Sequence, residues 1–319
     1  MRLRVEGKTP LNGVYQPSGN PNAAAALLAA ALLTDQPMTL DNVPQTASTQ
    51  VMIDLAVWLG AEVTHSGDHR LTLKAESIAK RNLTPTETQG FVGALLYIAP
   101  ILTRRGYVRM EVDYPLNRIR THLEALRDLG QDVVIVEGAI EVRAARWAFN
   151  DIMLLQSSVT ATEICMMLAA TLGKETIIRN AASEPHVQQL ARVLEHMGAQ
   201  IEGVGSNTLH IFGYHDPTLI GTTAAVMPNY IEAASVAALA AVSGGRVQID
   251  GVQGADLHMI ARVYSFLGIT LDVDGQALFV PRHTPLTVSN REEDVDASIK
   301  TAPWPGFPSD LVAIATVAA

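Results

Sequence analysis

The stretch VQQLARVLEHMGAQIEGVGSNTLHI, residues 187–211, contains a helix, its end and a hairpin in one uninterrupted pattern. Apolar side chains recur at the spacing of one helix face, at Val187, Leu190, Leu194 and Met197. Gly198 then predicts a left-handed helix end, because glycine has no Cβ to clash in that conformation. Beyond it, two alternating segments flank the turn Gly-Ser-Asn at 205–207, which predicts two antiparallel strands.

The same helix end recurs along the chain at an interval of about 70 residues, with glycines at Gly60, Gly130, Gly198 and Gly268. Upstream of each lies an alanine-rich apolar helix that runs into a strand; the helices are predicted around 23–33, 92–102, 166–172 and 233–242. A helix that is apolar on nearly every face belongs inside a domain. The sequence therefore predicts an α/β (α+β) fold of repeated βαβαββ units, four of them complete and a fifth beginning near Leu286.

Composition sets limits on the functions that the chain can have. Its 319 residues are 48% hydrophobic, which is enough to form two domains. The formal charge of −9 and the lack of any Lys/Arg block argue against a nucleic-acid partner. The apolar runs are too short to span a membrane, so no membrane partner is expected.

The residue types that hold metals and cofactors are sparse or badly spaced. Cys165 is the single cysteine, which excludes an internal disulfide and fits a cytoplasmic location. Its place in an apolar helix predicts a core residue rather than a nucleophile. The histidines lack metal-ligand spacing and no glycine-rich nucleotide loop is present, so neither a metal nor a cofactor is expected.

Several short sequence motifs, in the same order, resemble those of the enolpyruvyl transferase family, above all its UDP-N-acetylglucosamine branch. They are SGNPNAA (18–24), NVP (42–44), SVTATE (158–163), NAASEP (180–185), PNYIE (228–232) and KTAPWPGFPSD (300–310). The resemblance implies a two-domain inverted α/β-barrel with its last third missing. It also implies an incomplete first domain formed by residues 1–20 and 218–319, and a second domain of three βαβαββ units over 21–217.

The resemblance further implies a reaction and a set of site residues. The family transfers the enolpyruvyl group of phosphoenolpyruvate to a hydroxyl of UDP-N-acetylglucosamine and releases phosphate, a step of peptidoglycan synthesis. By resemblance, Asp310 is the base for the sugar hydroxyl, and Asn22 survives from the catalytic word at the first helix start. The residues matching the nucleotide side are Arg118 or Arg120, His122, Ser158, Val159 and Thr160.

The chain departs from the family where the chemistry lies. Pro21 stands at the position of a phosphate-facing Lys, and the loop with the proton-donating Cys is deleted before Pro115. Val92 and Gln45 fall at or near two further cationic positions, and Thr160 replaces a family Gly. These departures predict impaired transferase activity. They leave open a second hypothesis, a non-catalytic paralogue that binds UDP-sugars or acts as a regulatory or scaffold module.

Two of the candidate site residues also have structural interpretations. Asp310 follows Ser309 and precedes an apolar run, so it is a candidate helix N-cap as well as a candidate base. Asn22 would similarly cap the helix that begins at Ala23. Because the first domain is expected to be incomplete, we also predict exposed apolar surface on the last helix and self-association of the protein.

Overall fold

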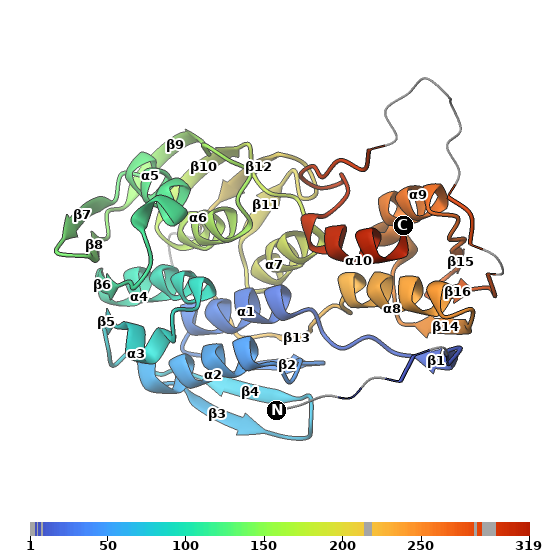
Figure 1. Ribbon diagram of the computed structural model, residues 1–319. Helices are drawn as coiled ribbons and strands as arrows, with labels where there is room; N and C mark the ends of the chain where they lie inside the picture. Colours follow the sequence, from blue (N-terminus) through green and yellow to red (C-terminus); the bar gives the residue numbers. More distant parts are fainter. Residues whose placement is uncertain (1–3, 5, 8, 214–218, 284–285, 289–297) are drawn as a thin grey trace. The chain divides into compact units, whose positions relative to one another are not determined.

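The computed structural model describes residues 4, 6–7, 9–213, 219–283, 286–288 and 298–319. The chain forms two compact units, one from Met1–Ser18 with Pro228–Ala319 (unit 1), the other from Gly19–Met227 (unit 2). Both are built from four-stranded sheets covered by helices (Figure 1). In each sheet one pair of strands is parallel and the other two pairs are antiparallel, the pattern expected of a βαβαββ unit.

Unit 2 contains three such modules. The first comprises α1 (Pro21–Ala30), η1 (Ala31–Leu33), β2 (Met38–Asp41), α2 (Ala47–Leu59), β3 (Glu62–His65), β4 (Leu71–Lys74) and the distant β13 (Thr223–Ala225). The second comprises β5 (Asn82–Leu83), α3 (Pro85–Thr88), η2 (Val92–Tyr97), α4 (Ile98–Arg105), β6 (Tyr107–Glu111), η3 (Leu116–Ile119), α5 (Arg120–Asp128), β7 (Asp132–Val136) and β8 (Ala139–Arg143). The third comprises β9 (Trp147–Met153), α6 (Val159–Thr171), β10 (Gly173–Arg179), α7 (Pro185–His196), β11 (Gln200–Glu202) and β12 (Thr208–Phe212).

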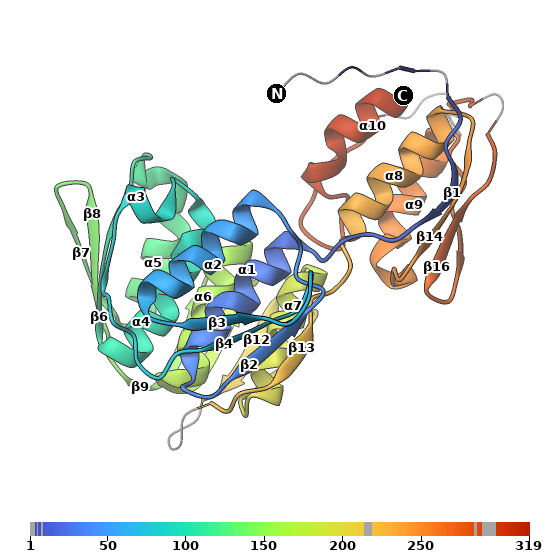
Figure 2. The same ribbon diagram turned by 90° about the horizontal axis from the view of Figure 1, so that it is seen from below.

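Unit 1 contains one complete module, which is followed in the described chain by two short helical segments. Its elements are β1 (Asn12–Tyr15), α8 (Tyr230–Val242), β14 (Arg246–Asp250), η4 (Gly254–Leu257), α9 (His258–Phe266), β15 (Asp272–Asp274), β16 (Ala277–Val280), η5 (Ser309–Leu311) and α10 (Val312–Ala318). Both views place α8 and α9 on the same face of the sheet β1-β14-β16-β15 (Figures 1 and 2). The first part of the fifth unit expected after Leu286 lies largely outside the described residues.

In two modules the first strand comes from a part of the sequence far from the other strands of its sheet. The segment before α1, β1, does not pair with β2 but runs parallel to β14, with Tyr15 opposite Ile249. Its place beside β2 is taken by β13, with Ala224 opposite Leu40. The N-terminal segment thus completes the sheet of unit 1, and a segment from beyond β12 completes the first sheet of unit 2.

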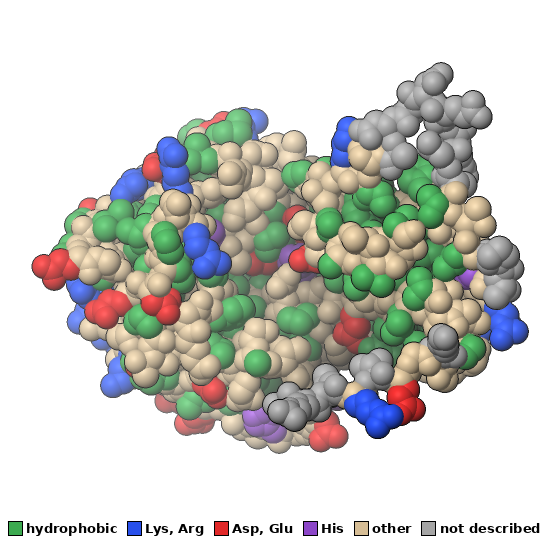
Figure 3. Space-filling view, viewed as in Figure 1, with side chains coloured by type: hydrophobic (Ala, Val, Ile, Leu, Met, Phe, Trp, Pro, Cys, Tyr) green, Lys and Arg blue, Asp and Glu red, His purple; other side chains and the backbone are tan. Residues whose placement is uncertain are grey.

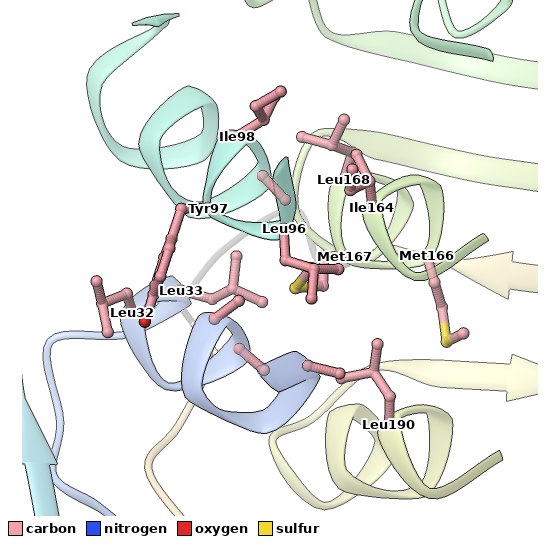
Figure 4. Close-up of a cluster of buried hydrophobic side chains, with 14 of the residues drawn as sticks. Leu32, Leu33, Leu96, Tyr97, Ile98, Ile164, Met166, Met167, Leu168 and Leu190 are labelled. Carbon is pink, nitrogen blue, oxygen red and sulfur yellow. The ribbon is translucent and has the colours of Figure 1, made fainter. Parts of the chain in front are cut away.

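In unit 2 the helices lie together in the middle and the three sheets lie outside them (Figures 1 and 2). Every residue of α1 from Ala23 to Ala30 is buried, because its small side chains let the neighbouring helices approach closely. Leucine, isoleucine, methionine and tyrosine side chains from η1, η2, α4, α6 and α7 fill the space between them (Figure 4). The Tyr97 hydroxyl, buried there, donates a hydrogen bond to the carbonyl of Met52 at 2.6 Å.

The local signals of the sequence are confirmed. Gly60, Gly130, Gly198 and Gly268 all have positive φ, between 77° and 115°, at the ends of α2, α5, α7 and α9. A hairpin follows each of these helices. Cys165 is fully buried in α6, and burial raises the pKa of its thiol to about 12, which confirms it as a core residue. Among the described residues, none of the helices is both long and apolar enough to cross a membrane.

Candidate functional site

The start of α1 is capped by Asn20. Its side-chain oxygen accepts hydrogen bonds from the backbone N–H groups of Asn22, at 2.9 Å, and Ala23, at 3.0 Å. Pro21 takes the first helical position, where its missing N–H costs nothing. The interpretation of Asn22 as the cap is therefore wrong. Its side chain is exposed and makes no hydrogen bond to any other described residue, so it is available to a ligand.

The predicted residues His122 and Thr160, 38 residues apart, meet in the structure. Nε2 of His122, on α5, lies 2.6 Å from Oγ1 of Thr160, the second residue of α6. The imidazole is only 6% exposed, and burial lowers its pKa to about 4, with a small opposing effect of the Ile119 backbone. His122 is therefore neutral at physiological pH.

The first turn of α6 has free backbone donors. Ser158 caps the helix: its hydroxyl accepts from the N–H of Ala161 at 3.4 Å, and its carbonyl accepts from that of Thr162 at 2.9 Å. The N–H groups of Val159 and Thr160 have no partner within the helix. Such groups at a helix N-terminus, together with the helix dipole, favour the binding of an anion.

Two exposed arginines lie beside His122 along the chain. Arg118, in η3, stacks on Tyr114, with its guanidinium carbon 5.4 Å from the ring centre. The Tyr114 side chain is partly buried, and this burial raises the pKa of its hydroxyl to about 12. Arg120 opens α5, and its side chain has no ion pair with the rest of the described chain. Both arginines remain candidates for the family position.

In unit 1, Asp310 follows a loop that backbone hydrogen bonds and a buried aromatic ring hold in place. The Ala302 N–H donates to the Phe307 carbonyl at 3.2 Å, the Gly306 N–H donates to the Pro303 carbonyl at 2.8 Å, and the Phe307 ring is buried. Asp310 follows in η5, where neither η5 nor α10 has a side-chain cap. The interpretation of Asp310 as an N-cap is therefore wrong. Its carboxylate is exposed and has no hydrogen bond or ion pair to the residues that the structure describes.

A second carboxylate of unit 1, Glu232, was not singled out from the sequence. It accepts hydrogen bonds from the Ser18 hydroxyl at 2.5 Å, from the Ser18 N–H at 3.2 Å and from the Tyr15 hydroxyl. The bond to Glu232, together with burial, raises the pKa of Tyr15 to about 12. Ser18 and Glu232 each lie in a word that resembles the family, but they are 214 residues apart, and only the fold pairs them.

Two buried ionisable groups of unit 2 were also missed. Glu163 is the single charged residue of α6; burial and the neighbouring Glu184 raise its pKa well above the usual value. His186, near the start of α7, is buried with no hydrogen bond at either ring nitrogen, and its pKa falls to about 4. A lone carboxylate in an apolar helix was the available signal for Glu163. No group of three His, Cys, Asp or Glu side chains in the described ranges could hold a metal ion.

The positions that depart from the family are used structurally. The connection from β6 to η3 is short, residues 112–115, and contains no cysteine. Gln45 donates from its side chain to the Asp68 carbonyl at 2.7 Å, and Val92 opens η2. None of these positions places a cation or a thiol beside the starts of α1 and α6.

Known proteins resemble the chain in both sequence and fold. A model of the EPSP synthase (3-phosphoshikimate 1-carboxyvinyltransferase) family matches residues 5–318. The UDP-N-acetylglucosamine 1-carboxyvinyltransferase of Bradyrhizobium diazoefficiens is 37% identical over 320 residues, which cover 99% of this chain and 73% of that protein. The protein of the same name from Treponema denticola is 35% identical and covers 99% of this chain and 74% of its own length.

Solved structures agree with the fold. The crystal structure of the enolpyruvyl transferase NikO from Streptomyces tendae matches with a TM-score of 0.77 and 20% identity, over 88% of this chain and 68% of that one. The chain spans about three-quarters of the length of the curated relatives that it matches. The mixed α/β fold and the match over residues 5–318 lead to one conclusion: the chain belongs to the EPSP synthase family of enolpyruvyl transferases.

Proposed function

We propose that the chain transfers the enolpyruvyl group of phosphoenolpyruvate to a hydroxyl of UDP-N-acetylglucosamine, as a step of peptidoglycan synthesis in the cytoplasm. The single observation that carries this proposal is Asp310, an exposed carboxylate held at the end of a braced loop without any partner among the described residues. Asp310 neither caps a helix nor forms an ion pair with a described residue. The relatives named UDP-N-acetylglucosamine 1-carboxyvinyltransferase supply the acceptor.

In the proposed reaction Asp310 acts as general base. It removes the proton of the sugar hydroxyl while the oxygen attacks C2 of phosphoenolpyruvate, and the methylene carbon takes up a proton from solvent water. Phosphate then leaves as a proton is lost again from that carbon, so the enolpyruvyl group ends on the sugar oxygen. No metal or organic cofactor enters these steps. A base placed in this way contributes roughly 10²–10⁴-fold to the rate.

The proposal also assigns the nucleotide side. The unpaired N–H groups at the start of α6, and the exposed arginines Arg118 and Arg120 that precede His122 in the chain, suit the two phosphates of UDP. At the start of α1, the exposed amide of Asn22 is the surviving polar group of the family word. Both features support a small-molecule partner with a diphosphate.

Phosphate release from purified protein supplied with UDP-N-acetylglucosamine and phosphoenolpyruvate tests the reaction. We expect release from the wild type and a loss of about 100-fold or more in Asp310→Asn, because the amide cannot accept the proton. Asp274→Asn, which changes an exposed carboxylate of β15 in the same unit, should keep the wild-type rate. Wild-type protein that releases no phosphate above the blank would end the transferase proposal.

A second candidate is a non-catalytic module that binds UDP-sugars. It is favoured by the absence of a phosphate-facing cation at Pro21 and by the short 112–115 connection without a thiol. Cys165 cannot substitute for that thiol, because it is buried in the core. Calorimetry separates the two candidates: binding of UDP-N-acetylglucosamine without phosphate release supports the module, whereas binding with release supports the enzyme.

A further inference from the structure

The sheet of unit 1 is hollowed on the face that its helices do not cover. Helices α8 and α9 lie on one face (Figure 2), where Val247, Ile249 and Leu278 are buried. Side chains along a strand alternate between the two faces, so the neighbours of these residues point away from the helices. On that side a hollow of about 740 Å³, a volume usual for small-molecule sites, has among its lining residues Asn12, Val14, Arg246, Gln248, Phe279 and Arg282.

Two arginines lie at one end of this hollow. The antiparallel pairing of Val247 with Val280 brings Arg246, at the start of β14, and Arg282, just beyond β16, to the same end of the sheet. The guanidinium of Arg246 has no hydrogen bond or ion pair with any described residue. Arg282 donates from Nε to the Gly244 carbonyl at 3.0 Å, and its other guanidinium nitrogens have no partner in the described chain. Two such groups in one concave surface suit the oxygens of a phosphate.

An aromatic ring lies farther along the same hollow. Phe279 on β16 is partly buried and stands opposite Gln248 on β14 and Asp272 on β15. Its ring stacks on no other aromatic ring and on no cation of the described chain, so it can stack on a flat ligand. Asp272 is the one acidic side chain among the described residues that line the hollow. It lies two strands from Arg246, about 10 Å by the spacing of strands, so the end with the arginines stays positive.

The amide of Gln248 supplies a hydrogen-bond acceptor beside this ring. Its Nε2 donates to Oδ1 of Asp250 at 2.7 Å. Because an ionised carboxylate can only accept, this bond fixes which end of the amide carries the nitrogen. The oxygen Oε1 of Gln248 is left without a donor in the described chain. A flat ligand that stacks on Phe279 would therefore be matched best by an amino group at its edge.

We propose that this hollow binds a nucleoside monophosphate whose base carries an amino group. The phosphate lies between Arg246 and Arg282, the base stacks on Phe279, and the amino group donates to Oε1 of Gln248. All the residues involved belong to unit 1. The proposal is independent of the transferase function, and it stands or falls separately from phosphate release.

Calorimetry of the full chain with four probes tests the proposal. Adenosine 5′-monophosphate contains all three features, whereas adenosine lacks the phosphate and inorganic phosphate lacks the base. Inosine 5′-monophosphate has a carbonyl in place of the amino group and would set an acceptor against Oε1 of Gln248. We expect saturable binding of adenosine 5′-monophosphate and roughly tenfold weaker binding, or worse, of the other three. No saturation up to about 5 mM, or equal affinity for inorganic phosphate or for inosine 5′-monophosphate, would overturn the proposal.

Three variants connect the binding to the hollow. Arg246→Gln should bind adenosine 5′-monophosphate roughly tenfold more weakly or worse, because a charged hydrogen-bond donor to the phosphate is lost. Phe279→Leu, which keeps an apolar side chain and removes the ring, should cost about as much. Arg262→Gln is the matched control: Arg262 is an exposed arginine of the same unit, but it lies on α9, across the sheet from the hollow. Equal affinity of Arg246→Gln and Arg262→Gln would contradict the proposal.

Hydrogen exchange with and without adenosine 5′-monophosphate distinguishes this hollow from the proposed nucleotide side of unit 2. Peptides covering β14 and β16 should gain protection, peptides covering α6 should not, and UDP-N-acetylglucosamine should not displace the probe. Displacement by UDP-N-acetylglucosamine, with protection confined to unit 2, would place the binding there and rule out the hollow.

Discussion

The buried carboxyl of Glu163 lowers the stability of the folded protein at high pH. It lies fully buried in α6, where burial and the neighbouring Glu184 disfavour its charged form and raise its pKa. In the unfolded chain the same carboxyl ionises near its usual value of about 4.3. As pH rises above that value, the unfolded state loses a proton that the folded state retains, so the free energy of unfolding falls.

Glu163→Gln should therefore stabilise the protein at high pH and leave it unchanged at low pH. Each unit of pKa shift corresponds to about 1.4 kcal/mol, so a gain of more than about 1 kcal/mol is expected at pH 8 and almost none at pH 4. Urea unfolding of wild type and variant at the two pH values measures the difference. A gain of equal size at both pH values would show that the effect is packing and not ionisation.

The residues at the start of α1 show what the sequence could and could not predict at this scale. The word SGNPNAA contains two asparagines, and either one has the side chain of a cap. Proline prefers the first position inside a helix, so Pro21 places the cap at Asn20, a signal that the choice of Asn22 ignored. The meeting of His122 with Thr160 had no such local signal, because it depends on how α5 packs against α6.

Asn20→Ala and Asn22→Ala form a matched pair that tests this assignment. Loss of the cap should lower the free energy of unfolding by about 1 kcal/mol in Asn20→Ala, because two backbone donors lose their acceptor. Asn22→Ala should leave stability nearly unchanged and weaken ligand binding instead. Thermal unfolding and calorimetry with UDP-N-acetylglucosamine measure the two effects. Equal destabilisation by both variants would contradict the assignment.

At the scale of elements, the sequence predicted what is local and not which strands join. Helix ends and hairpins follow from glycine positions and alternation within a few residues, as at Gly198 and the 205–207 turn. The exchange of β1 and β13 rests on contacts between distant segments, and both strands are short. The hydrophobic pattern and the β-propensity of such short strands do not specify a pairing partner, because the edges of many strands present similar backbone hydrogen-bonding groups.

The position of β1 depends on a close backbone approach at Gly245. A Cβ added there would lie 1.8 Å from the carbonyl oxygen of Leu11, which itself accepts from the Arg246 N–H at 2.9 Å. Gly245→Ala should therefore force β1 away from β14 and destabilise unit 1 by roughly 2 kcal/mol or more, as expected for a severe backbone clash. Gly7→Ala, at a glycine with open space around it, is the control.

Hydrogen exchange measured by mass spectrometry would locate the effect of Gly245→Ala. Peptides covering β1 and β14 should lose protection, whereas peptides from the three sheets of unit 2 should keep it. Unchanged protection in β1 would mean that this strand pairs differently from the register of Tyr15 with Ile249.

At the scale of the whole molecule, the two units use similar helices in different surroundings. The alanine-rich α1 is buried on every side within unit 2. The similarly alanine-rich α8 exposes Leu239 by 52%, and α10 beside it exposes Val317 by 79%. Hydrophobic side chains gather over this part of unit 1 on the face seen in Figure 3. Contiguous apolar surface of this kind is usual at protein interfaces and rare elsewhere.

We therefore expect the protein to self-associate through α8 and α10 in a concentration-dependent manner. Leu239→Lys and Val317→Lys should each shift the equilibrium toward the monomer, because a charge on this surface must be desolvated for copies to pack. Val134→Lys, which changes an exposed apolar residue of β7 in unit 2, is the matched control and should not change the equilibrium. Sedimentation velocity over a dilution series measures it. A wild type that stays monomeric at every concentration, or equal effects of all three lysines, would rule out this surface as the interface.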